Sequence, residues 1–131
     1  MYIWADVSRF SWKDRVKSFG YAADGLLVVL RTQHNARIHA VLSAVAVGLG
    51  LALGISRLEW CAIAGVIGLV WAAEALNTAL EALADAVMPE RNPKVAAAKD
   101  AAAGAVLVAA ITASVVGLLV FGPRLLEAFR G

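Results

Sequence analysis

Polar residues recur at helical spacing in the second half of the chain. Glu74, Asn77, Thr78, Glu81 and Asp85 stand at positions i, i+3, i+4, i+7 and i+11. At about 100° per residue they share one face of a helix, and leucines take the other faces. Carboxylates and an amide on one stripe are suited to accepting a proton and to binding a hard cation. The spacing therefore predicts a polar site along one helix.

The elements around this stripe are strongly apolar. The chain has 131 residues, of which 61% are hydrophobic and 17% charged; soluble domains are typically 45–50% apolar and about 25% charged. We therefore expect an all-α membrane protein forming a single domain, 1–131, with transmembrane helices at 38–55, 59–88 and 97–121. One cysteine excludes a disulfide scaffold. The basic residues form no stripe on a soluble face, which argues against nucleic acid as a partner.

The segment 1–36 has a different composition. Aromatic and basic residues alternate along it, which favours an amphipathic helix at the membrane surface; a cytosolic tail is the alternative. If the N-terminus is cytoplasmic, nine of the twelve basic residues lie on that side. The positive-inside rule then predicts a multi-pass protein of the inner (plasma) membrane, with its N-terminus and the 88–94 connection in the cytoplasm.

The two glutamates of the stripe differ in depth. Counted from Trp60 at the outer interface, Glu74 lies about 21 Å into the membrane and Glu81 about 31 Å, near the cytoplasmic boundary. An acidic residue inside a span costs about 2–3 kcal/mol and indicates function by default. The alternative is a stripe that joins helices by hydrogen bonds, which average under about 1 kcal/mol each in membranes. Because two carboxylates are costly for that purpose, we favour a functional site.

Other helices bring polar residues to the same depth. Lys99 begins the third span, where an ammonium is suited to phosphoryl oxygens; a lysine that snorkels to the interface is the alternative. Gln33 and His39 flank the start of the first span. His34 and His39 are a poor metal site, since no cysteine or third histidine accompanies them, and we expect them to bond to lipid headgroups. Polar residues of three helices at the cytoplasmic boundary therefore predict a site where a nucleotide from the water could meet a lipid headgroup.

These motifs together resemble the small prokaryotic diacylglycerol kinases and undecaprenol kinases. EALNTALEALADAV (74–87) fits the family helix E-x-x-N-x-x-x-E-x-x-x-D. AKDAAAGAVLVAA (98–110) and NARIH (35–39), preceded by GYAADGL (20–26), extend the match. The resemblance covers about residues 14–121, and the motifs are specific in combination.

The resemblance implies a homotrimer of three-span subunits, with active sites shared between neighbours. It also implies phosphorylation of a membrane lipid hydroxyl by ATP with Mg²⁺. Glu74 would be the catalytic base, Asn77 would support it, and Glu81 would bind the metal. The residues that would contact the nucleotide or lie near it are Tyr21, Glu81, Glu90, Lys99 and Asp100. The estimated depths of the two glutamates agree with these roles. The submerged Glu74 lies beside the lipid, and the shallower Glu81 can hold a hydrated Mg²⁺.

The chain departs from the family pattern in two places. Gln33 stands where a second metal-binding glutamate is usual, so we expect Gln33 and Glu81 to form a metal site of weaker affinity. Ala23 and Asp24 replace a Trp-Lys pair, which leaves the lipid contacts open. Undecaprenol and diacylglycerol both remain candidate substrates, and NARIH favours the undecaprenol branch.

Two other classes of function remain as alternatives. One is a small oligomeric proton-coupled transporter that uses Glu74 as its proton site. The other is a non-catalytic oligomeric scaffold, which leaves the acidic stripe unexplained. Glu81→Gln distinguishes them, because it should abolish Mg²⁺-dependent turnover only in a kinase.

Overall fold

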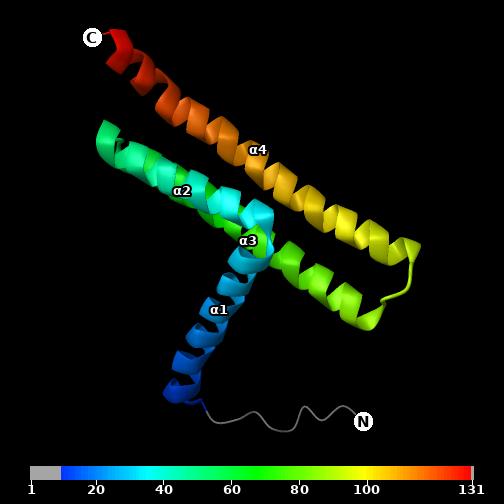
Figure 1. Cartoon of the computed structure of the whole chain (residues 1–131). Coiled ribbons are helices and arrows are strands. Elements are labelled where there is room, and N and C mark those ends of the chain that lie inside the picture. Colours follow the sequence, from blue (N-terminus) through cyan, green and yellow to red (C-terminus); the bar gives the residue numbers. More distant parts are fainter. Residues whose placement is uncertain (1–9, 131) are drawn as a thin grey trace.

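The described part of the chain is entirely helical apart from short connections. The computed structural model describes residues 10–130. It contains helices α1 (Trp12–Thr32), α2 (His34–Leu53), α3 (Arg57–Val87) and α4 (Pro93–Arg130). Helices α2, α3 and α4 run side by side, and α1 leaves them at a steep angle (Figure 1). The expected all-α class is confirmed.

Helices α2, α3 and α4 are each long and apolar enough to cross a membrane. The chain itself buries only 11%, 17% and 22% of their most apolar stretches, respectively. Most of this apolar surface is therefore left for lipid or for other protein chains to cover, as expected of a membrane protein.

The turn between α2 and α3 determines where α2 ends and where α3 begins. Gly54 adopts the left-handed conformation, with φ 60°, and ends α2 after Leu53. Ser56 forms a capping box with Glu59: its Oγ accepts from the Glu59 N–H at 3.3 Å, and Glu59 Oε2 accepts from the Ser56 N–H at 2.6 Å. α3 therefore begins at Arg57, two residues before the expected start.

Helix α4 is longer than the expected span of 97–121. It begins four residues earlier, with Pro93 as the first helical residue, where its missing N–H is not needed. Asn92 Oδ1 accepts from the Lys94 N–H at 2.9 Å and caps this end. Beyond Pro123, Arg124 Nη2 donates to Glu59 Oε2 at 2.6 Å. This ion pair holds the continuation of α4 against the start of α3.

The best-packed region lies at the end of the bundle away from the polar stripe. The buried core residues there are Ile55, Ile63, Val120 and Phe121. Gly50 lets Trp60 approach, since a Cβ at that position would lie 2.7 Å from Trp60 Cη2. This packing fixes α2, α3 and α4 together beyond the candidate site.

Helix α1 occupies part of the segment expected at the membrane surface, and the first nine residues of that segment lie outside the described residues. All residues from 12 to 28 are exposed. Its C-terminal end is held by Arg37 of α2, whose Nε donates to the Leu30 carbonyl at 3.2 Å. This contact places Gln33, the residue between the two helices, beside the bundle.

Candidate functional site

The polar stripe of α3 passes from a buried to an exposed environment. Glu74 is 2% exposed and Asn77 9% exposed, whereas Glu81 is half-buried and Asp85 is exposed. Thr78 donates to the Glu74 backbone carbonyl at 2.9 Å, so its hydroxyl is already occupied. The structure therefore presents two buried polar groups followed by a carboxylate accessible to water.

These groups open into one space of about 350 Å³ between α2, α3 and α4, called the polar cavity below. Four of the predicted site residues line it together: Gln33, Glu74, Asn77 and Glu81. The other lining residues are Asn35, Ile38, His39, Ala103, Val106, Leu107 and Ala110. Side chains from α2, α3 and α4 line this cavity, but those from α4 are apolar, and Lys99, which we expected beside them, is not among them.

Two oxygen atoms in this region are left without a hydrogen-bond partner. Asn77 Nδ2 donates to Glu81 Oε1 at 3.3 Å, which ties two stripe residues together. Asn77 Oδ1 and Glu74 Oε1, however, are buried and accept no hydrogen bond. Most buried polar atoms in proteins are paired, so these two oxygens are where a hydroxyl or a cation would be bound.

His39 is a member of this site that the sequence interpretation missed. Its Nε2 lies 3.3 Å from Glu74 Oε1, although the ring is not aligned for a hydrogen bond. We expected it to bond to headgroups, whereas the structure turns it toward the buried carboxylate. The available signal was its position inside the first span, because an ionisable residue within a span indicates function.

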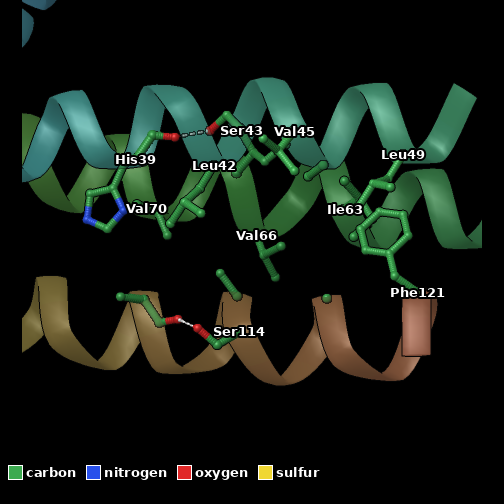
Figure 2. A pocket seen from close by; sticks show the side chains of 15 residues that line it. His39, Leu42, Ser43, Val45, Leu49, Ile63, Val66, Val70, Ser114 and Phe121 are labelled. Atoms are coloured by element: carbon green, nitrogen blue, oxygen red, sulfur yellow. Dashed lines mark hydrogen bonds between the residues drawn. The ribbon is translucent and has the colours of Figure 1, made fainter. Parts of the chain in front are cut away.

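A second space, the apolar cavity, runs along the bundle from His39. It has a volume of about 240 Å³ and is lined mainly by aliphatic residues of α2, α3 and α4. Figure 2 shows His39 at one end of it and Phe121 at the other. His39 and Ala110 line both cavities, so the apolar cavity meets the polar cavity beside Glu74.

The remaining predicted residues lie elsewhere in the single chain. Lys99 and Glu90 line a cavity at the connection between α3 and α4, and Lys99 Nζ donates to Asp85 Oδ1 at 2.8 Å. Tyr21 on α1 is 72% exposed and Asp100 is exposed, and neither lines these three cavities. One copy of the chain therefore does not bring all the predicted nucleotide residues together.

The oxygens of the polar cavity fit one kind of metal site. Within residues 10–130, no group of three His, Cys, Asp or Glu side chains could hold a metal ion. Mg²⁺ commonly uses one or two carboxylates together with waters and substrate phosphates. Glu81, the Gln33 amide and the unpartnered Asn77 Oδ1 are suited to that mode. They fit a Mg²⁺ that arrives with phosphates rather than a permanently held ion.

Comparisons with known proteins show which family this sequence resembles. The sequence profile described as Prokaryotic diacylglycerol kinase matches residues 20–121. The chain is 39% identical over 109 residues to the undecaprenol kinase of Bacillus subtilis, covering 83% of this chain and 89% of that relative. It is 38% identical over 111 residues to the diacylglycerol kinase of Synechocystis sp., covering 84% of this chain and 63% of that relative.

The resemblance seen in the motifs is thus confirmed, and the transporter alternative is not favoured. The match extends through α2 and α3 and most of α4, so it includes every residue that lines the polar cavity. The chain therefore belongs to the prokaryotic diacylglycerol kinase family and is a lipid kinase of the membrane.

Proposed function

We propose that this kinase transfers the γ-phosphoryl group of ATP, with Mg²⁺, to the hydroxyl of undecaprenol or diacylglycerol. The observation that carries the proposal is the polar cavity, where a buried carboxylate, a buried amide and a water-accessible carboxylate meet. Phosphoryl transfer mainly requires positioning and charge neutralisation, so such a small set of side chains suffices.

Glu74 is the catalytic base in this proposal. The proton of the lipid hydroxyl passes to the Glu74 carboxylate while the lipid oxygen bonds to the γ-phosphorus. The bond from that phosphorus to the bridging oxygen breaks, and ADP leaves. Burial of Glu74 supports this role, as does an Oε1 atom that accepts no hydrogen bond.

Glu81, Asn77 and Gln33 would hold the metal, and Asn77 orients Glu81. The Asn77 amide donates to Glu81 Oε1, which leaves the other Glu81 oxygen for the cation. Bound Mg²⁺ would neutralise charge on the transferred phosphates. The neutral Gln33 amide adds an oxygen ligand without adding charge.

The lipid chain enters through the apolar cavity. Its lining is mostly aliphatic, and it ends at His39 beside the proposed base. A lipid whose chain lies among α2, α3 and α4 would therefore present its hydroxyl to Glu74. We favour undecaprenol as the substrate because this chain covers 89% of the length of the undecaprenol kinase to which it is similar.

Lys99, Glu90, Asp100 and Tyr21 contact the nucleotide in an assembled homotrimer with its N-terminus on the cytoplasmic side of the inner membrane. Two observations support an assembly. The chain leaves most of its apolar helix surface uncovered, and these residues do not line the polar cavity of their own copy. A neighbouring copy would bring them to it.

The test is phosphate transfer from labelled ATP by the purified full chain in mixed micelles. Undecaprenol and diacylglycerol are offered separately at matched mole fraction, with and without Mg²⁺. We expect Mg²⁺-dependent transfer to one or both lipids. Glu81→Gln should remove the Mg²⁺-dependent turnover, while Glu127→Gln, the same change on the exposed end of α4, should retain it. Equal Mg²⁺ dependence in both variants would contradict the metal role of Glu81.

A further inference from the structure

We propose that His39 is a positioning residue for the base: its imidazole holds the Glu74 carboxylate in the orientation that receives the lipid proton. This inference rests on the proposed role of Glu74. The side chains are 15% and 3% exposed, respectively, and His39 Nε2 lies 3.3 Å from Glu74 Oε1. The pair is therefore largely shielded from water.

Among the described residues that line the polar and apolar cavities, His39 is the only basic side chain. The other polar neighbours in the polar cavity are amides and a second carboxylate. A buried carboxylate is costly without a hydrogen-bond donor or a countercharge beside it, and His39 is the group placed to supply one.

A second contact fixes His39 relative to Glu74. Trp71 of α3 lies one turn before Glu74, and its Nε1 donates to Ser43 Oγ at 3.3 Å. Ser43 in turn donates to the backbone carbonyl of His39 at 2.7 Å, as Figure 2 shows. Two cross-helix contacts one turn apart thus set the register of α2 against α3. The backbone of His39 therefore cannot shift along α3 without breaking the Trp71 contact.

His39 lies where it can orient Glu74 and still leave the carboxylate able to accept the proton of the lipid hydroxyl. The ring stands where the apolar and polar cavities meet. Glu74 Oε1 accepts no hydrogen bond from it in this structure, so that oxygen stays free to take a proton. A carboxylate oxygen has two lone pairs, so a rotation of the ring that aligned Nε2 with Oε1 would still leave one of them to accept the lipid proton. His39 thereby orients the base without itself contacting the phosphates.

Loss of the imidazole should reduce catalysis more than nucleotide binding. Without the imidazole at 3.3 Å, nothing would keep the buried carboxylate in place, and it would rotate away from the position in which it accepts the lipid proton. Misplacement of a reacting group by about 1 Å can cost on the order of 10²-fold in rate. We therefore expect a lower kcat with little change in the KM for ATP.

The experiment measures kcat and the KM for ATP of the full chain in micelles containing undecaprenol or diacylglycerol. The variants are His39→Leu, His39→Gln, His34→Leu and Glu74→Gln. His34 is a matched control, because it is an exposed histidine five residues away that lines none of the three cavities. We expect His39→Leu to lower kcat about 10²-fold, with the KM for ATP within about twofold. Glutamine carries an N–H donor, so His39→Gln should recover part of kcat, and His34→Leu should match the wild type.

The outcomes separate this inference from the function on which it rests. If Glu74→Gln keeps full activity, the base assignment fails. If Glu74→Gln is inactive while His39→Leu keeps wild-type kcat, or His39→Gln is no better than His39→Leu, the positioning role is overturned.

A spectroscopic measurement covers the case in which His39→Leu does not fold. The imidazole ¹⁵N shifts of His39 are compared between the wild type and Glu74→Gln in micelles. They should change while those of His34 stay fixed. An unchanged His39 signal would overturn the proposal.

Discussion

Lys99 and Asp85 face each other across the connection between α3 and α4, with Nζ 2.8 Å from Oδ1. Their side chains are 34% and 71% exposed. Exposed ion pairs of this kind contribute little to stability. The Lys99 ammonium has three donors and uses one here, so it remains able to bind phosphate oxygens.

Lys99→Met should therefore weaken ATP binding rather than unfold the protein. We expect the KM for ATP to rise about tenfold or more, the scale of a lost hydrogen bond to a charged group, while the melting temperature changes little. Asp85→Asn is the control, since it removes the same ion pair but keeps the ammonium. Equal effects of the two variants on the KM for ATP would show that Lys99 acts only as the partner of Asp85.

Gln33→Glu should strengthen the metal site. The side chain lines the polar cavity with Glu81, and each added carboxylate ligand raises the affinity of an oxygen site for a divalent cation. We predict that the Mg²⁺ concentration for half-maximal activity falls severalfold in a titration at saturating ATP.

Asn35→Asp adds the same charge to the same cavity and serves as the matched variant. If it lowers the Mg²⁺ requirement as much as Gln33→Glu does, the general charge of the cavity is responsible. The role of Gln33 as a ligand would then be contradicted.

Gly50→Ala should destabilise the protein. A Cβ there would lie 2.7 and 2.8 Å from two atoms of the Trp60 ring, and 3.0 Å from Ile55 Cδ1. Overpacking of this kind typically costs about 1–3 kcal/mol. Gly48→Ala on the same helix meets nothing within 4 Å and should be tolerated. Thermal unfolding in detergent compares the two variants, and equal melting temperatures would refute the packing argument.

The parts of the site that lie on one helix could be predicted from sequence. Glu74, Asn77 and Glu81 share a face because helical geometry alone sets their relative directions. The contact between His39 and Glu74 could not be derived in this way. It depends on how α2 is rotated against α3, and the small apolar residues of α2 give that helix no marked polar face to indicate the rotation.

The helix bounds also divide into those that the local sequence predicts and those that depend on contacts between helices. Three spans followed from the apolar runs, because burial in lipid requires long hydrophobic helices. The continuation of α4 past Pro123 did not follow. It is held by the pairing of Arg124 with Glu59, residues that lie 65 positions apart in the chain. Contacts of this range are set by the packed bundle and not by local sequence preference.

The measurement that tests the central claim most directly is phosphate transfer by Glu74→Gln, with ATP binding measured on the same preparation. The substitution keeps the size of the side chain and removes the proton acceptor. If Glu74 is the base, transfer to undecaprenol or diacylglycerol should fall by about 10²-fold or more, while ATP still binds in the presence of Mg²⁺. Transfer at the wild-type rate by a folded Glu74→Gln protein would contradict the account.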